Sequence, residues 1–249
     1  MASPAIVHFP SFMLQICGEL YAPASSSPGR VKEQTSATYA RALSKPGFQV
    51  LTFDADYRGE STGEPRGTLT LPASGVLGIC ASGGYTSYAV QSDSRIHALA
   101  TASAAYVGRM TRCGAIAGAL NQAPGGAAHV PTDKSKIPER ADSFFRDAAA
   151  YYGTARGRHE RSDQKVPPMS YGLMVSHDSF RFQHLIVPKP LLMIAGSNAQ
   201  TLHYSKTAVA LASEPKEFFT IQRKNHSELY DDVTETAPKL IKFFGHCLQ

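Results

Sequence analysis

The sequence predicts one α/β domain in which a mainly parallel sheet lies between two layers of helices. Short apolar runs alternate along the chain with segments of helical periodicity, which is typical of strands joined by crossover helices. The chain has 249 residues, 43% of them hydrophobic, which is enough for one substantial core. We therefore expect residues 1–249 to form a single domain. The stretch from about 106 to 172 does not follow this alternation, and we expect it to form a helical cap over the carboxyl edge of the sheet.

The individual elements follow from local pattern and from residues that end helices. Apolar runs that end at small or polar residues predict five neighbouring strands of one parallel sheet, over residues 48–53, 76–79, 98–102, 190–195 and 218–221. Weaker alternation predicts an earlier strand within residues 12–21. Helical spacing predicts helices over residues 32–44, 85–90, 203–212 and 234–244.

Composition and charge exclude several classes of function. The net charge is +5, but the basic residues are spread along the chain, and the one basic run, residues 156–161, contains an acid and no interleaved aromatic residue. We interpret this run as a solvated loop and expect no nucleic-acid partner. No segment approaches the ~18 uninterrupted apolar residues of a membrane span, so we expect no membrane partner. The first residues lack the pattern of a signal peptide and the last three are not a peroxisomal tripeptide, which favours an intracellular, cytoplasmic protein.

The cysteines indicate thiol chemistry rather than a structural framework. Cys17, Cys80, Cys113 and Cys247 are widely separated and show no CxxC spacing, which argues against a zinc site and against disulfides. No carboxylate–histidine cluster has metal-ligand spacing, and no glycine-rich phosphate loop carries a lysine. We therefore expect no metal and no cofactor. The oligomeric state remains open from sequence.

The most informative local motif runs from Gly78 to Gly84 and reads GICASGG. A strand that ends in Gly-x-nucleophile-x-small-Gly forces a tight turn into a helix, and the nucleophile is held there in a strained conformation. The free N–H groups and positive end of that helix lower the pKa of a thiol and stabilise an oxyanion. This pattern indicates Cys80 as nucleophile. Ser82 is an alternative nucleophile one step into the helix, and an ordinary buried cysteine in a strand–helix turn is the non-functional alternative.

His226 is the favoured base because it lies after the last predicted strand and before the terminal helix. In a parallel sheet this position is a loop at the carboxyl edge, where ligands bind. His184 and His203 are less well placed. A third residue should follow the strand that ends at Gly196, where Gln200 is a candidate to orient the imidazole through its amide oxygen, or is simply a loop residue. Weaker acidic candidates are Asp54, Asp56, Asp178 and Glu228.

Several segments in order resemble the dienelactone-hydrolase-like branch of the α/β hydrolases, and most closely the fungal polyketide transferase/thiohydrolase group. They are GVLGICASGGYTSYAVQSDSRIHALATASAAYVGRM, FDADYRGESTGEPR, SFRF, PKPLLMIAGSNAQT and KNHSELYDD. The resemblance implies a three-layer α/β-hydrolase fold with Cys80 as nucleophile, His226 as base, and an acyl thioester or ester as substrate.

The chain departs from that family at three places. The family's acid, an aspartate, falls on Gln200. Between residues 23 and 31 the family has a central strand whose following loop supplies one oxyanion donor, and between residues 67 and 75 it has a helix. Residues 24–31 hold three serines, two glycine or proline breaks and one terminal valine, so we expect a central strand to be missing there. We also expect the helix between residues 67 and 75 to be missing, and the sheet to have a gap.

The sequence therefore predicts acyl transfer or hydrolysis. The Cys80 thiolate attacks a carbonyl, His226 takes up and returns the proton, and the N–H of Ala81 binds the oxyanion. The resemblance implies a polyketide-type acyl group, carried as a thioester on a carrier and passed to water or an alcohol, in secondary, toxin-like metabolism. The alternative is a catalytically impaired or non-catalytic relative that acts as a binding protein.

Overall fold

The computed structural model describes most of the chain that surrounds the predicted site. The described ranges are 5–11, 14–21, 34–53, 74–112, 127–128, 143–160, 165–166 and 168–248, with the single positions 133, 135, 137 and 139. Asp54, Asp56, Cys113, segment 24–31 and the stretch between Gly67 and Gly75 were singled out from sequence, and apart from the end of that stretch they lie outside these ranges.

The centre of the fold is a four-stranded parallel sheet. Its strands are β4 (Ser74–Ile79), β5 (Ile96–Ala102), β8 (Leu191–Gly196) and β9 (Lys216–Ile221), in the order β4-β5-β8-β9. Every neighbouring pair is parallel. Four of the five predicted parallel strands are therefore confirmed. They were predictable because strands buried on both faces are nearly continuous apolar runs.

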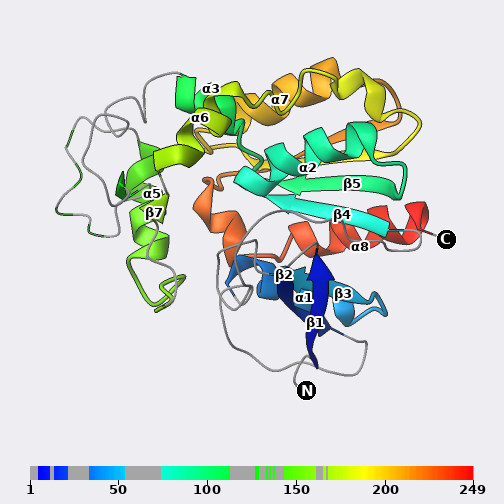
Figure 1. Ribbon diagram of the computed structural model, residues 1–249, viewed down its shortest axis with the longest axis horizontal. Coiled ribbons are helices and arrows are strands. Elements are labelled where there is room, and N and C mark those ends of the chain that lie inside the picture. Colours follow the sequence, from blue (N-terminus) through cyan, green and yellow to red (C-terminus); the bar gives the residue numbers. More distant parts are fainter. Residues whose placement is uncertain are drawn as a thin grey trace.

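Helices cover both faces of this sheet, which gives three layers (Figure 1). On one face, Ala100 and Leu192 pack with residues of α1 (Thr35–Ser44) and α8 (Thr236–Cys247). On the other face, Leu99 and Met193 pack with residues of α2 (Ala81–Ser92) and α7 (Leu202–Leu211). Successive residues of a strand point to opposite faces, so these two strands contribute to both halves of the core.

The N-terminal strands correct one prediction. β3 (Val50–Phe53) was expected to join the parallel sheet, but it pairs antiparallel with β2 (Leu14–Tyr21), which pairs antiparallel with β1 (Ala5–Ser11). An apolar run predicts a strand but carries no information about its partner, and local pairing with β2 is what the chain adopts. Strand β1 was not predicted from sequence.

The two sheets are not joined by any strand pairing within the described residues. β3 ends one sheet and β4 ends the other. The sequence predicts a gap in the sheet at residues 24–31, and these residues lie outside the described ranges. The strand that carries the nucleophile motif is thus a terminal strand of its sheet as described.

Short elements lie between β5 and β8, in a region that includes the stretch 106–172 where a cap is predicted. These are α3 (Val107–Met110), β6 (Ala127–Ala128), α5 (Ser143–Tyr152), β7 (Lys165–Val166), α6 (Pro168–Ser176) and η4 (Gln183–Ile186). Helix α5 lies to one side of the sheet (Figure 1) and packs on η5 (Ser227–Tyr230). Among the described residues, no helix has both the length and the apolar character needed to cross a bilayer.

Candidate active site

Cys80 lies in a strained turn between β4 and α2. Its φ is 56° and its ψ is −122°, a conformation that is unusual for a residue with a side chain. Its carbonyl oxygen accepts hydrogen bonds from the N–H groups of Gly83 and Ala105, at 3.0 and 2.9 Å. A Cβ on Gly78 would lie 2.7 Å from the Cα of Gly83, so the turn requires glycine at position 78. These contacts explain why the motif combines small residues with a projecting nucleophile.

Ser82, the alternative nucleophile, occupies a different position. It lies within the first turn of α2, and it is exposed. Its carbonyl accepts a hydrogen bond of 2.7 Å from the Thr86 hydroxyl, as expected for a residue inside a helix. Cys80, not Ser82, is the residue at the strained turn.

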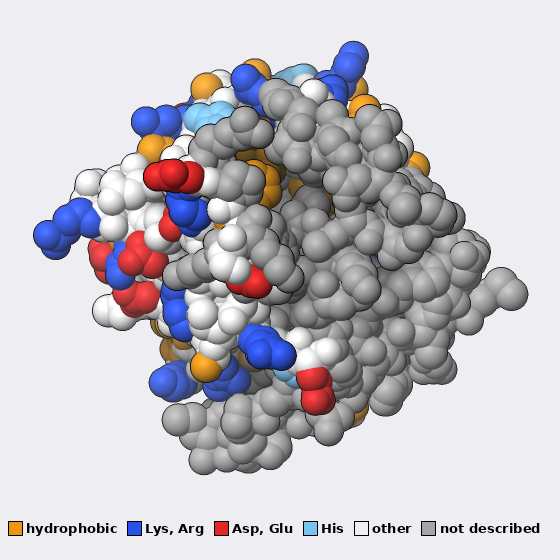
Figure 2. All heavy atoms as spheres, turned by 90° about the vertical axis from the view of Figure 1, so that its left-hand side faces the viewer, with side chains coloured by type: hydrophobic (Ala, Val, Ile, Leu, Met, Phe, Trp, Pro, Cys, Tyr) orange, Lys and Arg blue, Asp and Glu red, His pale blue; other side chains and the backbone are white. Residues whose placement is uncertain are grey.

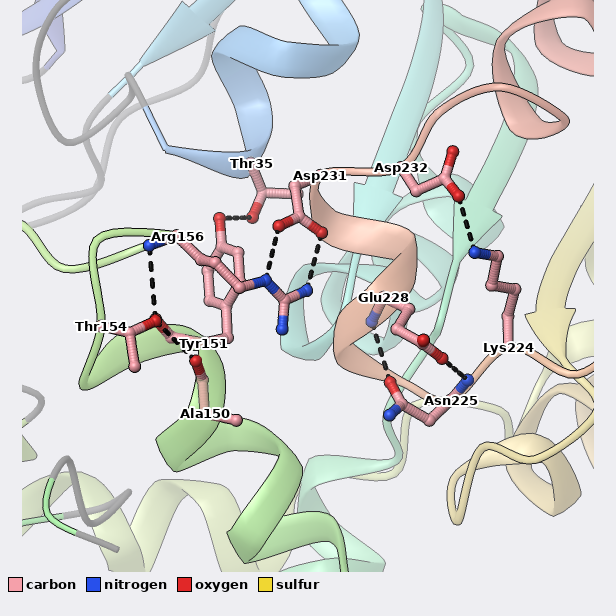
Figure 3. A network of polar contacts seen from close by, with 10 residues as sticks. All are labelled: Thr35, Ala150, Tyr151, Thr154, Arg156, Lys224, Asn225, Glu228, Asp231 and Asp232. Carbon is pink, nitrogen blue, oxygen red and sulfur yellow. Dashed lines mark hydrogen bonds and ion pairs between the residues drawn. The ribbon is translucent and has the colours of Figure 1, made fainter.

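His226 lies on a loop that several contacts fix at the carboxyl edge of the sheet. The backbone N–H of Asn225 donates to the Glu228 carboxylate at 2.7 Å, and the N–H of Glu228 donates to the Asn225 side chain at 2.9 Å (Figure 3). This reciprocal pair is the arrangement of a capping box. The Ser103 hydroxyl donates to the carbonyl of His226 at 3.1 Å. The loop therefore holds His226 at the same edge of the sheet as Cys80, as predicted.

Four side chains form a continuous polar chain at this edge. The Thr201 hydroxyl lies 2.5 Å from Nδ1 of His226, and the Tyr230 hydroxyl lies 2.7 Å from Nε2. The Tyr230 hydroxyl also hydrogen-bonds the Cys80 thiol. Cys80 and His226 are thus separated by one hydroxyl group. Proton transfer between them is possible over that distance, since it requires direct contact or one intervening group.

Burial sets the protonation of this centre. His226 is 1% exposed, and burial lowers its pKa to about 3. Burial also raises the pKa of the Cys80 thiol, against the opposing effects of its hydrogen bonds with Tyr230 and with the N–H of Ala81. The sequence predicts a thiol pKa lowered by the helix end. That prediction is wrong in direction, because loss of solvent outweighs the helix contribution. At neutral pH the centre contains a thiol and a neutral imidazole.

The predicted third residue does not contact His226. The amide nitrogen of Gln200 donates to the Ser143 hydroxyl at 2.6 Å, and the side chain is exposed. The next residue, Thr201, takes the position beside Nδ1. The described hydrogen bonds do not bring the other acidic candidates to His226 either. Asp178 accepts a hydrogen bond from Tyr106, and Glu228 is engaged in the loop.

Sequence reasoning missed Thr201 and Tyr230. Thr201 directly follows Gln200, the residue expected beside the imidazole. The composition of a loop does not show which of its residues points to a given side chain. Tyr230 lies four residues after His226 at the end of a 3-10 helix, where its hydroxyl contacts the imidazole. A polar residue at i+4 from a candidate base is a usable signal, because residues four apart on a helix are neighbours.

Helix α5 covers this chain of residues. The Phe144 ring packs edge-on against His226, with centroids 5.0 Å apart, and the Tyr151 ring packs on Tyr230 at the same distance. Arg156, just after α5, makes two hydrogen bonds of 2.8 Å to the Asp231 carboxylate (Figure 3). Helix α5 and the residues just after it are therefore anchored to the segment that carries His226.

The surface around this anchor carries both signs of charge. Figure 2 shows basic and acidic side chains interspersed over the described part of the face that carries α5. Arg156 forms an ion pair with Asp231, and Lys224 forms one with Asp232. Within the described residues, no group of three or more His, Cys, Asp or Glu side chains could hold a metal ion.

Acidification is expected to destabilise the protein through His226. The imidazole takes up a proton near pH 6.5 in the unfolded chain but only near pH 3 in the folded protein, so the unfolded chain binds more protons in between. The free energy of unfolding should fall as pH drops below 6.5, by about 3 kcal/mol at pH 4 from this group alone. Denaturant unfolding of wild type and His226→Gln at both pH values measures it. Equal pH dependence of the two proteins would contradict this assignment.

The fold and the nucleophile turn define the class of this chain, which has the α/β-hydrolase fold. A solved structure of the α/β hydrolase GrgF from Penicillium sp. sh18 superimposes with a TM-score of 0.71 at 18% identity, over 98% of each chain. The crystal structure of the hypothetical protein PA2218 from Pseudomonas aeruginosa superimposes with a TM-score of 0.82 at 25% identity, over 98% of this chain and 93% of that one.

Comparison by sequence gives bacterial relatives. YcjY of Escherichia coli K12, described as uncharacterized, is 28% identical over 287 aligned positions, which cover 98% of this chain and 94% of YcjY. PA2218 is 29% identical over 82% of this chain and 66% of its own length. No protein-family profile matches the sequence. The alignment with YcjY is longer than this chain, so YcjY carries residues that this chain lacks. The dienelactone-hydrolase branch and the fungal group are not confirmed.

Proposed function

We propose that this protein hydrolyses or transfers acyl groups from thioesters or esters, with Cys80 as nucleophile and His226 as base. The observation that carries the proposal is the strained Cys80 turn, whose thiol lies one hydroxyl group away from a buried imidazole. A nucleophile held at such a turn and paired with a base is the arrangement that covalent acyl transfer requires.

The proposed reaction proceeds through an acyl-cysteine intermediate. Cys80 attacks the substrate carbonyl, and the developing oxyanion is bound by the N–H of Ala81, which already contacts the sulfur. His226 takes up the thiol proton and returns it to the leaving group. Water or an alcohol then releases the acyl group, without a cofactor.

The substrate class rests on resemblance rather than on the geometry of the site. The motifs around Cys80 and His226 resemble a polyketide transferase/thiohydrolase group, which supports a polyketide-type acyl group on a carrier thioester and a role in secondary metabolism. We propose that the chain is a single domain with a cap over about 106–172, and that a small-molecule acyl substrate binds between the cap and the sheet edge.

One observation favours the alternative of a catalytically impaired relative that binds a ligand without turning it over. His226 has a hydroxyl, not a carboxylate, at Nδ1, and the thiol at rest is protonated. A neutral partner cannot stabilise an imidazolium as a carboxylate does.

Trapping of the acyl intermediate tests the proposed function. The full-length protein is incubated with a hexanoyl N-acetylcysteamine thioester, quenched in acid and examined by peptide mass spectrometry. We expect the hexanoyl group on Cys80 and at background level on Cys247, a half-buried cysteine whose pKa is also raised by burial. Equal acylation of both cysteines would favour the impaired relative.

A further inference from the structure

We propose that Tyr230 is a catalytic residue that transfers the proton between Cys80 and His226. This inference rests on the proposed function and adds a residue to that site. The geometry carries it, because the Tyr230 hydroxyl hydrogen-bonds the Cys80 thiol on one side and lies 2.7 Å from Nε2 of His226 on the other. A phenol touching both the nucleophile and the base is the shortest described path between them.

The hydrogen-bonding capacity of the hydroxyl fits this arrangement. Tyr230 has three polar neighbours, namely Cys80, His226 and Tyr152. A phenol has one O–H donor and two acceptor lone pairs. If Tyr230 donates to Nε2 of His226, it can accept from the thiol and from the Tyr152 hydroxyl, so all of its capacity is used.

Donation from Tyr230 to Nε2 implies one tautomer of the imidazole. A neutral imidazole whose Nε2 accepts must carry its proton on Nδ1. Thr201, 2.5 Å from Nδ1, then accepts this proton through its hydroxyl oxygen. In this direction the polar chain runs from the Cys80 thiol through Tyr230 and His226 to Thr201.

The reaction step balances in protons and electron pairs. As the sulfur forms a bond to the thioester carbonyl carbon, the S–H proton passes to the Tyr230 oxygen while the proton of Tyr230 passes to Nε2 of His226. The carbonyl π electrons move to the oxygen. When the intermediate collapses, the bond to the leaving sulfur breaks, and that thiolate receives a proton from the imidazolium by way of Tyr230. Water then attacks the acyl-cysteine by the same route, and Cys80 regains its proton.

A competing interpretation is that Tyr230 separates Cys80 from His226 and keeps the thiol inactive. The two interpretations predict opposite effects when the hydroxyl is removed. If Tyr230 transfers the proton, removing its hydroxyl lowers the reactivity of Cys80. If Tyr230 keeps the thiol inactive, removing its hydroxyl raises the reactivity of Cys80. The ring is buried and packs on Tyr151, so phenylalanine keeps the shape of the site.

The experiment compares Tyr230→Phe with wild type in two assays of the full-length protein. In hexanoyl thioester turnover, we expect kcat to fall by ~100-fold or more with KM nearly unchanged, since positioned proton transfer contributes that much. In iodoacetamide labelling resolved by peptide, we expect Cys80 to react at least ~10-fold more slowly while Cys247 is unchanged. Unchanged or faster reaction of Cys80 would overturn the inference.

Tyr151→Phe is the matched control. Tyr151 is also buried and contacts the Tyr230 ring, but its hydroxyl lies 3.2 Å from Thr35, away from the site (Figure 3). We expect turnover and labelling of Tyr151→Phe to match wild type. If Tyr151→Phe loses as much as Tyr230→Phe, the effect is one of packing and the inference fails.

If Tyr230→Phe does not fold, NMR of the wild-type protein still tests the inference through the tautomer of His226. The nitrogen-15 NMR shifts of His226 should show the Nδ1–H tautomer at neutral pH, and an Nε2–H tautomer would overturn the inference. Failure of the proposed function looks different: wild type and Cys80→Ala would then turn over thioester equally, while the tautomer and the labelling of Cys80 would still respond as described.

Discussion

Replacing Cys80 with alanine is expected to reduce acyl-thioester turnover by at least ~10³-fold. Alanine fits the strained turn but offers no electron pair to attack the carbonyl, so no acyl-enzyme can form. What remains is the rate enhancement from binding and from the N–H of Ala81. Initial rates of thioester cleavage on purified wild type and variant measure the effect, with circular dichroism to verify folding.

Cys247→Ala is the control for this loss. Cys247 lies at the end of α8, and like Cys80 it is half-buried with a pKa raised by burial. Removing its thiol should leave turnover within a factor of ~2, since nothing in the described site contacts it. Turnover that survives Cys80→Ala would contradict Cys80 as nucleophile.

Placing a carboxylate beside His226 should raise turnover, through the variant Thr201→Asp. The Thr201 hydroxyl lies 2.5 Å from Nδ1, so an aspartate there would contact the imidazole directly. Its negative charge would raise the pKa of His226 from about 3 toward the ordinary range and stabilise the imidazolium formed during attack. We expect turnover to rise by ~10-fold or more, with a new pH dependence between pH 4 and 7.

The variant Gln200→Asp tests whether a carboxylate one residue before Thr201 has the same effect on turnover. Gln200 is exposed and its amide contacts Ser143, so a carboxylate there should leave turnover and its pH profile as in wild type. The opposite result, a gain for Gln200→Asp and none for Thr201→Asp, would show that the loop places residue 200 at the imidazole during catalysis.

The parts of the fold that sequence could predict are those in which local pattern and burial coincide. Buried strands such as β8 are uninterrupted apolar runs, and the Cys80 turn requires glycine at position 78, so both leave a clear trace in the sequence. The partner of β3 could not be predicted, because its four residues carry no information about whether they pair with β2 or β4.

The sequence predicted Cys80 and His226 as candidate site residues, but it did not predict the hydroxyl groups that contact His226. Cys80 and His226 are placed by strand ends, which sequence pattern locates to within a residue or two. Tyr230 and Thr201 contact His226 through single hydroxyl groups, and an isolated tyrosine or threonine in a sequence resembles any core or loop residue. The direction of the Cys80 pKa shift also depends on burial in three dimensions, which a motif does not report.

The protonated state of Cys80 has a consequence for the durability of the protein under oxidative stress. Peroxides attack thiolates far more readily than thiols, and the resulting sulfenic acid can be oxidised further to irreversible products. A cysteine that ionises only while its substrate is being attacked exposes little thiolate to such oxidants between turnovers. Under the proposed mechanism, the burial that keeps the Cys80 thiol protonated therefore also protects it from peroxide.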